Sequence, residues 1–376
     1  MSEAAPDVVV LGGGVIGLSI AWRARQRGLT VEVVDDAPGR GASWAAAGLI
    51  APVTEVHHGE EALLDLAADS ARRYPDFIEE LEEAAGRPAG YRRSGTLMVA
   101  PGADDLAALS EIYALQRKLG LEVSRLSGRE ARALEPGLTP HVRGGFLIEG
   151  DHAVDNRLLG EALLEACRRS GVELTAARVA AVEVGSARIT GGRLASGEVR
   201  RGGTFVLAAG CWSAALPGLP PEAVPPVRPV KGQLLYLRAE EGELPLSRNV
   251  RGVDVYIVPR SDGRIAIGAT VEERGFDTTV TADGIFQLLR SAFELVPGLR
   301  ECELIETLAG LRPGTPDNAP LLGRGALENL VVATGHYRNG ILLTPVTADE
   351  IAALLAGEEP PLLEPFSPLR FAREPA

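Results

Sequence analysis

The chain has 376 residues, of which 45% are hydrophobic and 24% are charged. This length suggests two or three domain-sized units, and the composition is typical of a soluble globular protein with a sizeable core. The net charge is −13, so we expect no nucleic-acid partner, although one local basic site could still hold a small anion.

The N-terminal residues and the cysteines bear on where the protein works. The sequence MSEAAPDVVV carries acids where a signal peptide carries lysine or arginine, and glycines interrupt the apolar stretch after it. We therefore expect a cytoplasmic protein with no membrane partner. Cys167, Cys211 and Cys302 are too few and too scattered for a disulfide framework. They form no Cys-x-x-Cys pair, and with only His57 and His58 adjacent we expect no metal site.

A strand, a helix and a second strand open the chain. Residues 7–11, DVVVL, form a short apolar strand; residues 12–29 have helical periodicity; and residues 30–36, TVEVVDD, form the second strand. Such a βαβ unit is the usual opening of a nucleotide-binding domain. Farther along, the patterns predict helices over 59–85 and 104–119, and strands over 94–100 and 144–150.

The second half of the chain passes between two kinds of architecture. A helix over 156–171 leads to an apolar strand, TFVLAAG, which suits a parallel sheet. A proline-rich stretch over 216–230 marks a crossing between domains. The strands after it mostly alternate apolar and polar residues, as an antiparallel sheet with one covered face does. The apolar strand at 330–335 returns to the first architecture.

The predicted fold is of the α/β class, with a doubly wound domain interleaved with an α+β domain that is built on a mainly antiparallel sheet. We expect the doubly wound domain to consist of residues 1–85, 151–225 and 319–376. The other domain is expected to consist of residues 86–150 and 226–318.

A glycine motif directly follows the first strand. Gly12, Gly14 and Gly17 have the spacing G-x-G-x-x-G. The first allows a tight turn, the second lets a pyrophosphate approach the backbone, and the third lets helix and strand pack closely. Asp35 ends the second strand, where a carboxylate can accept hydrogen bonds from an adenosine ribose. A purely structural turn is the alternative, but strand, helix and acid together favour a dinucleotide site.

The stretch after this acid distinguishes between dinucleotides. Residues 37–52, APGRGASWAAAGLIAP, carry almost no large side chain except Trp44. An NAD-binding domain normally continues into another helix and strand, whereas small residues let the backbone come close to a bulky flat ligand. The return to the sheet at 330–335 would bring contacts from the end of the chain to the same ligand. Both observations favour FAD.

Six segments occur together in this sequence: VVVLGGGVIG, GASWAAAG, LAAGCWS, PVKGQ, GLRPGTPD and GHYRNGILL. Together they resemble the D-amino-acid oxidase superfamily of flavoproteins, and within it the glycine oxidases of thiamine biosynthesis. The similarity covers nearly the whole chain, and the last two segments are the most specific. It implies noncovalent FAD, a small amino-acid substrate, oxygen as electron acceptor, and a homo-oligomer, by resemblance a homotetramer.

The resemblance also assigns residues to the cofactor. It places residues after the glycine motif along the pyrophosphate, the acid of the second strand on the ribose, and the small-residue stretch near the ribityl chain and the isoalloxazine. One backbone position would meet the adenine, and residues 336–342 would face the pyrimidine edge of the flavin. With the glycine motif and the neighbouring acid Asp36 added, the full set of expected cofactor residues is Gly12, Gly14, Val15, Ile16, Gly17, Asp35, Asp36, Ala42, Ser43, Ala47, Gly48, Leu49, Val179, His336, Tyr337, Arg338, Asn339, Gly340, Ile341 and Leu342.

Three positions depart from the family pattern. Asp36 adds a second acid at the ribose, and Ala42 lacks a hydroxyl that some relatives offer. Asp254 is acidic where relatives can carry histidine. The first two departures leave FAD binding expected, whereas the third leaves the preferred amine open.

Two arginines and a tyrosine are the candidates for binding the substrate. A carboxylate needs a planar, two-pronged donor that keeps its charge, and arginine supplies one. The resemblance matches Arg312 and Arg338 to substrate-carboxylate arginines and Tyr256 to a pocket tyrosine. We therefore expect Arg312 to be the main anchor, Arg338 the second donor, and Tyr256 a pocket residue that hydrogen-bonds the carboxylate. The alternatives are ion pairs for the arginines and an ordinary strand position for the tyrosine. Gly340 and its neighbours are expected to open a helix whose free N–H groups stabilise negative charge on the reduced flavin.

The predicted function is oxidative deamination of glycine, and of small amines such as sarcosine or D-alanine, to the imine or glyoxylate. Ammonia and hydrogen peroxide would be released, and the product would supply the thiazole of thiamine. We nominate no general base, because a neutral amine needs none. Two alternatives stay open: another small D-amino-acid or N-methylamine oxidase or dehydrogenase, and a non-catalytic flavin-fold binding protein.

Overall fold

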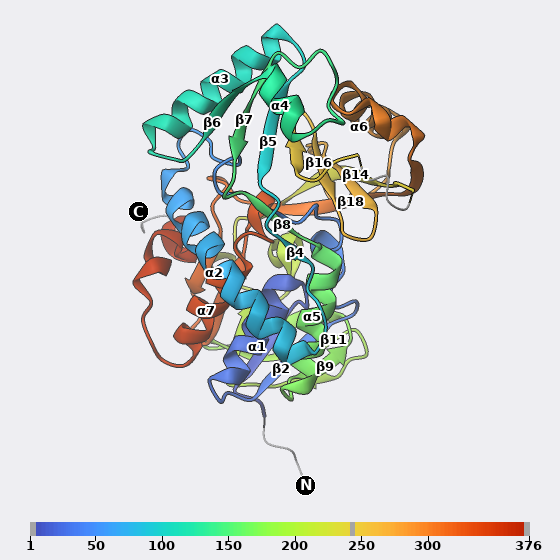
Figure 1. Cartoon of the computed structure of the whole chain (residues 1–376). Coiled ribbons are helices and arrows are strands. Elements are labelled where there is room, and N and C mark those ends of the chain that lie inside the picture. The colour runs from blue at the N-terminus through green and yellow to red at the C-terminus, as the bar shows by residue number, and fades with distance from the viewer. Residues whose placement is uncertain (1–4, 241–244, 372–376) are drawn as a thin grey trace.

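The computed structural model describes residues 5–240 and 245–371. Two β-sheets organise it, a six-stranded sheet in the lower half of Figure 1 and an eight-stranded sheet in the upper half. Each sheet takes its strands from separate stretches of the chain, so the two halves are interleaved in sequence. No helix in the described ranges is long and apolar enough to cross a membrane.

The six-stranded sheet is parallel except at one edge, where β19 runs antiparallel to β20. The strand order is β19-β20-β13-β1-β2-β9. Because β1 has β2 on one side and β13 on the other, the strand order reverses at β1, and α/β sheets bind ligands at such points. The strands are β1 (Val8–Leu11), β2 (Val31–Asp35), β9 (Glu173–Ala176), β13 (Thr204–Leu207), β19 (Leu321–Arg324) and β20 (Leu330–Thr334).

Both faces of this sheet are covered. Val8 and Val10 of β1 belong to an apolar cluster shared with four helices, whereas Val9 and Leu11 belong to a second cluster. Alternate residues of a strand point to opposite faces, so the two clusters lie on opposite sides of the sheet. The helices are α1 (Val15–Gln26), α2 (Glu61–Ala85), α5 (Asn156–Arg169) and α7 (Thr344–Leu355).

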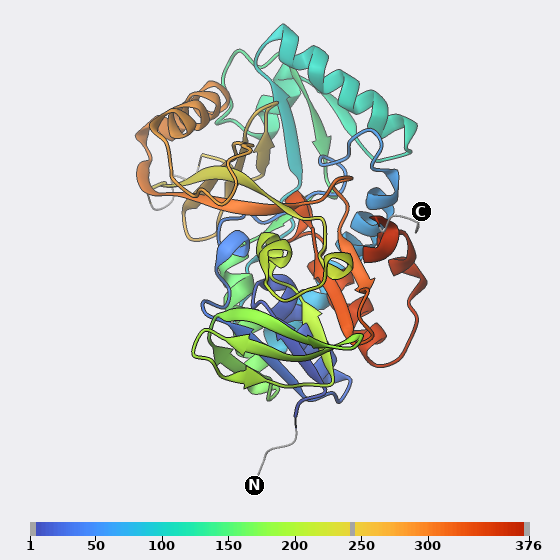
Figure 2. The ribbon, with the colours of Figure 1, turned by 180° about the vertical axis from the view of Figure 1, so that it is seen from behind.

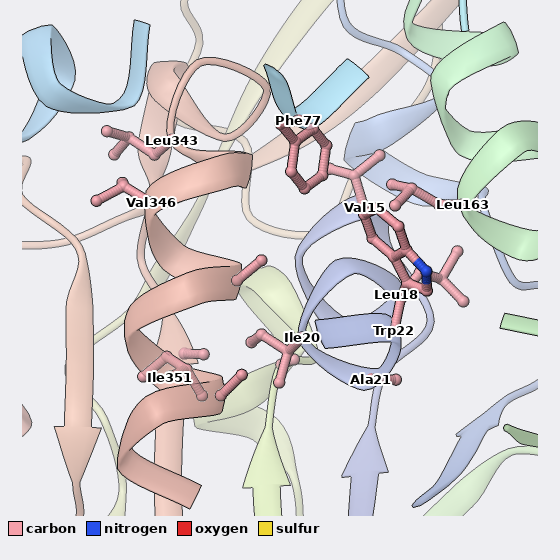
Figure 3. Close-up of a cluster of buried hydrophobic side chains, with 14 of the residues drawn as sticks. Val15, Leu18, Ile20, Ala21, Trp22, Phe77, Leu163, Leu343, Val346 and Ile351 are labelled. Carbon is pink, nitrogen blue, oxygen red and sulfur yellow. The ribbon is translucent and has the colours of Figure 1, made fainter. Parts of the chain in front are cut away.

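Helix α1 is central to the helical face. Figure 3 shows Ile20 directed towards Ile351 of α7, and Trp22 beside Phe77 of α2. The Trp22 and Phe77 rings meet edge to face, with centroids 5.5 Å apart. The opposite face is covered by a small sheet, seen in front in Figure 2, that consists of β10 (Val179–Gly185), β11 (Arg188–Leu194) and β12 (Val199–Arg200).

The eight-stranded sheet has the order β18-β14-β17-β16-β15-β5-β7-β6. All neighbouring strands are antiparallel except β15 and β5. This is the mainly antiparallel sheet that the alternating patterns predict. Its strands are β5 (Thr96–Ala100), β6 (Ser124–Ser127), β7 (Gly144–Ile148), β14 (Arg228–Arg238), β15 (Asn249–Arg251), β16 (Tyr256–Pro259), β17 (Arg264–Gly268) and β18 (Glu303–Gly314).

Helices cover the eight-stranded sheet, and a small sheet lies near the middle of the molecule (Figure 1). The helices are α3 (Ala103–Lys118), α4 (Gly128–Leu134) and α6 (Ala282–Leu295). The small sheet consists of β3 (Leu49–Ile50), β4 (Tyr91–Arg92) and β8 (His152–Val154). The predicted α/β class is confirmed, and a division into domains at the residues predicted above remains our proposal.

Candidate active site

A cavity of about 1540 Å³ is lined by residues of both halves of the molecule. Sites for drug-sized ligands occupy about 300–1,000 Å³, so this cavity has room for a dinucleotide together with a small substrate. Every residue expected at the cofactor lines it, with the exception of Gly17, the third glycine of the motif. Arg312 and Tyr256 line it as well.

The glycine turn joins β1 to α1 beside the cavity. Gly12 has a φ of +114°, and a Cβ there would stand 2.5 Å from the carbonyl oxygen of Ala208. Only glycine tolerates both conditions. A Cβ on Gly17 would stand 1.9 Å from the carbonyl oxygen of Gly12. Gly17 therefore lets α1 pack against the turn, which explains why it does not line the cavity.

Asp35, at the end of β2, ties this turn to the loop that follows it. Its Oδ2 accepts a hydrogen bond from the backbone N–H of Gly13 at 2.7 Å, and its Oδ1 accepts one from Ala37 at 2.7 Å. An ionised carboxylate has about four acceptor positions, so Asp35 can still accept bonds from ribose hydroxyls. Asp36 is exposed on the same cavity wall.

The C-terminal segment passes along the cavity between β20 and α7. A short 3₁₀ turn, η5 (Tyr337–Asn339), follows β20, and α7 begins at Thr344, so the expectation that Gly340 opens a helix is wrong. Gly340 nevertheless has helical angles, φ −57° and ψ −41°. Among the hydrogen bonds of the described residues, the N–H groups of Gly340, Ile341 and Leu342 have no acceptor. The expected donors are therefore supplied by a turn that precedes the helix.

His336 begins this segment, and its surroundings hold its imidazole in the neutral form. Its side chain is buried, and Nε2 lies 3.1 Å from Oγ1 of Thr347 in α7. Burial lowers the pKa of His336 to about 3. The imidazole is therefore neutral near pH 7. Tyr337 follows it with a φ of +47°, an uncommon conformation for a residue with a side chain.

Arg312, in β18, reaches across the sheet towards the cavity. Its Nη1 donates to the carbonyl oxygen of Thr270 at 3.0 Å and to that of Lys231 at 3.4 Å. Within the described ranges these two carbonyls are its only hydrogen-bond partners, and no carboxylate pairs with it. A partly buried cation without an acidic partner thus faces the cavity, as an anchor for a substrate carboxylate requires.

Tyr256 stands beside this arginine. Burial raises the pKa of its hydroxyl, and the nearby Arg312 offsets only part of that effect. The phenol is therefore protonated at neutral pH and can donate a hydrogen bond. Tyr256 pairs with Gly268 across β16 and β17, where a Cβ would stand 2.6 Å from the tyrosine oxygen. The glycine leaves room for the ring.

Arg338 also lines the cavity, but it already has acidic partners. Its Nε lies 3.1 Å from Oε2 of Glu55, and its Nη2 pairs with Glu60. Nη2 also lies 2.8 Å from Nδ1 of His57. Glu55 in turn pairs with Arg251. The geometry matches the ion-pair alternative for Arg338, and its role as second carboxylate donor stays a prediction.

The Glu55 cluster, which we define as Glu55, Glu60, Arg251 and Arg338, was not found from the sequence. Burial alone would raise the pKa of Glu55, but Arg251 and Arg338 bring it below its usual value. Its two acids and two arginines then balance in charge. Residues so far apart in sequence give no local signal of their contact.

Two residues discussed from the sequence alone also line the cavity. Asp254 is exposed at the cavity wall, two residues before Tyr256. Cys211 is buried there, and burial raises its thiol pKa to about 12. The described residues contain no group of three or more histidine, cysteine or acidic side chains that could hold a metal ion.

These features fit a bound FAD. The glycine turn at the start of α1 offers a close backbone approach to a pyrophosphate, and Asp35 offers acceptors for a ribose. Val179, at the start of β10, lines the cavity where the adenine is expected. The N–H groups of residues 340–342 offer donors to a flavin ring.

Comparison with known proteins supports this interpretation. Residues 7–354 match the family described as FAD dependent oxidoreductase. The chain is 35% identical to a glycine oxidase of Geobacillus kaustophilus over 96% of both chains. It superposes on a crystal structure of glycine oxidase from that organism with a TM-score of 0.89 and 33% identity, covering 98% of this chain and 100% of the other.

A longer relative gives a second comparison. The chain is 36% identical to the bifunctional protein ThiO/ThiG of Synechocystis over 97% of its own length. It spans only 54% of that relative. The family match covers more than half of this chain, and the residues of the cavity fit the cofactor. The protein therefore belongs to the FAD-dependent oxidoreductases, with FAD as its cofactor.

Proposed function

We propose that this enzyme oxidises glycine and small amines such as sarcosine or D-alanine. With glycine the balanced reaction consumes oxygen and water and yields glyoxylate, ammonia and hydrogen peroxide. The observation that carries the proposal is Arg312, a cation at the cavity whose only partners in the described part of the chain are two carbonyl oxygens. The similarity of this chain, over nearly its whole length, to proteins named glycine oxidase supports the proposal.

The residues around the cavity divide the work of binding and charge stabilisation. Arg312 would hold the substrate carboxylate, and Tyr256 would donate a second hydrogen bond to it. Bound FAD supplies the two-electron oxidation and the transfer of those electrons to oxygen. The N–H groups of residues 340–342 would stabilise the negative charge that develops on the cofactor side of the cavity.

Among the described residues, two groups that line the cavity have a lowered pKa, and neither is suited to remove a proton from the substrate amine. His336 is neutral, but its ring is buried against Thr347. Glu55 is ionised, but its carboxylate is held by Arg251 and Arg338. The substrate would therefore enter the reaction as the free amine.

An anaerobic titration with glycine tests the proposal. Purified enzyme should lose the visible absorbance of its oxidised flavin as glycine reduces the cofactor. The anaerobic reduction should already yield glyoxylate and ammonia, and admitting air should restore the absorbance and produce hydrogen peroxide in the same amount. If sarcosine or D-alanine bleaches the flavin and glycine does not, the glycine assignment is wrong. If no amine bleaches it, the binding-protein alternative holds.

We also propose that the product supplies the thiazole of thiamine and that the enzyme is a homo-oligomer, specifically a homotetramer. The relation to a ThiO/ThiG protein supports the first part. The first part can be tested in a bacterium that lacks its own glycine oxidase. If the proposal holds, such a bacterium should grow without thiamine when it carries this gene. Light scattering coupled to size exclusion would test the second part, and a mass of one 39.5 kDa chain would contradict it.

A further inference from the structure

The loop of residues 43–48 borders the cavity, and its backbone carbonyls are bonded from behind. Nδ2 of Asn156 donates to the carbonyl oxygens of Ser43 and Trp44, at 2.8 and 2.9 Å. Nη2 of Arg260 donates to that of Ala47 at 2.7 Å. None of the side chains that hold this loop lines the cavity, so they lie on its other side.

These side chains form one buried network. Oδ1 of Asn156 accepts bonds from Nη2 of Arg260 at 3.1 Å and from the Tyr236 hydroxyl at 3.4 Å. The hydroxyl of Tyr236 also lies 3.4 Å from the carbonyl oxygen of Ala46. The three residues are at most 1% exposed. Asn156 begins α5, Tyr236 belongs to β14, and Arg260 directly follows β16. Figure 1 shows α5 in the lower half of the molecule, and β14 and β16 in the upper half.

The carbonyl bonds fix the direction of the N–H groups. In a planar trans peptide the C=O of one residue and the N–H of the next point in opposite directions. With the carbonyls of Ala46 and Ala47 bonded behind the loop, the N–H groups of Ala47 and Gly48 face the cavity. Neither has an acceptor among the hydrogen bonds of the described residues. Gly48 has a φ of +71°, and a Cβ there would stand 1.9 Å from the carbonyl oxygen of Val154.

We propose that Asn156, supported by Arg260 and Tyr236, is a positioning residue for the cofactor. It holds the loop of residues 43–48 so that the N–H groups of Ala47 and Gly48 are ready to bond the FAD ring. Asn156 does not touch the substrate or the cofactor itself. The proposal rests on FAD as the cofactor and not on glycine as the substrate, so the two can fail separately.

The substitution Asn156→Asp tests the network with little change of shape. Aspartate keeps the acceptor for Arg260 but replaces the donor to Ser43 and Trp44 with an oxygen that repels both carbonyls. We expect apo-protein to bind FAD at least about tenfold more weakly, which is ~1.4 kcal/mol and the order expected from losing two buried hydrogen bonds. The visible flavin spectrum of the variant should also shift, because the ring loses oriented donors.

Asn329 provides a matched control. Its Nδ2 also donates to two carbonyl oxygens, those of Ile189 at 3.0 Å and Gly203 at 3.1 Å, and its Oδ1 accepts from the N–H of Ile189 at 2.8 Å. It is buried but does not line the cavity. Asn329→Asp should lower the Tm of apo- and holoprotein equally and leave the FAD dissociation constant within about twofold.

Two measurements test the proposal. Titration of apo-protein with FAD, followed by flavin fluorescence, gives the FAD dissociation constant, and thermal unfolding gives the Tm with and without FAD. Asn156→Asp should reduce the rise in Tm that FAD produces, whereas Asn329→Asp should not. Unchanged FAD affinity in Asn156→Asp, or equal losses in both variants, would overturn the proposal. If Asn156→Asp does not fold, Tyr236→Phe replaces it, with an expected loss of about two- to threefold in FAD affinity; unchanged affinity there would also overturn it.

Discussion

The guanidinium of Arg312 lies against the backbone of Gly232. A Cβ on Gly232 would stand 2.3 Å from Nη2 and 2.4 Å from Nη1 of the arginine. The register of β14 and β18 produces this contact, because Arg312 pairs with Val230 and its side chain can reach past it to the glycine. The missing side chain at residue 232 therefore creates the space in which the guanidinium of Arg312, the proposed substrate anchor, lies.

Gly232→Ala should displace the anchor without unfolding the sheet. The clashing atoms are the flexible end of a side chain, and residue 232 has no left-handed backbone angle. We expect kcat/KM for glycine to fall by about tenfold or more, mainly through KM, since misplacing a charged partner costs at least ~1.4 kcal/mol. Steady-state assays with glycine and with a simple amine that lacks a carboxylate measure it. An equal loss for both substrates would show that the substitution acts through the sheet and not through a carboxylate anchor.

The sequence predicted the parts of the site that depend on local order. The glycine turn, Asp35 and residues 336–342 could be placed because each follows a recognisable strand, and strand ends of one sheet meet at one edge. Arg312 could be nominated because the family resemblance matches it to a substrate-carboxylate arginine, and a carboxylate requires a fixed cation in the pocket.

Contacts between distant segments could not be predicted in this way. Glu55, Arg251 and Arg338 meet only because three different segments converge at the cavity, and the pairing of Arg338 follows from that convergence. Asn156 and Arg260 likewise meet across the two halves. The prediction that Gly340 opens a helix was wrong, because residues 340–343 form a turn and α7 begins only at Thr344. The turn leaves free the same N–H groups that a helix start would leave free.

Glu55→Gln should change the charge balance of the pocket. Removing this carboxylate leaves the Glu55 cluster with one excess positive charge, because Arg251 loses its partner. We expect the KM for an amine with two carboxylates, such as iminodiacetate, to fall relative to that for glycine by roughly five- to tenfold, the order of one unit charge a few ångströms away. Glu60→Gln should act in the same direction. A KM ratio that stays constant in both variants would show that these acids do not influence the bound substrate.

The flavin should leave the protein when it is denatured. Cys211 is the one cysteine among the described residues that lines the cavity, and burial raises its pKa to about 12, which keeps the thiol protonated and unreactive. Acid precipitation should therefore release FAD into the supernatant. Yellow colour retained in the pellet, and lost in Cys211→Ser, would identify a covalent bond at this residue.

The rate should rise with pH between neutral and alkaline conditions. The amine of glycine is mostly protonated near neutrality, and oxidation requires the free amine. The pKa of His336 is about 3, that of Glu55 is below its usual value and that of Tyr256 is above it, so none of these three changes charge around pH 7. We expect kcat/KM to increase with pH as the free amine does. A flat profile would mean that the enzyme itself removes the proton.

Arg312→Ala should raise the KM for glycine strongly and spare FAD binding. Losing one partner of a desolvated charge pair costs about 2–5 kcal/mol, and each ~1.4 kcal/mol is tenfold, so kcat/KM should fall by roughly 30-fold to several thousand-fold. Arg312→Lys should recover only part of the loss, because a point charge cannot reproduce the two-pronged guanidinium.

The control for Arg312→Ala is an amine without a carboxylate, whose kcat/KM should change much less. This comparison separates an anchor from a residue that merely supports the sheet, since a structural defect would affect both substrates. If both lose activity equally, or if the variant loses its flavin, Arg312 is structural. Arg338 would then have to release Glu55 and Glu60 to bind the carboxylate. In that case Arg338→Ala, and not Arg312→Ala, should affect glycine selectively.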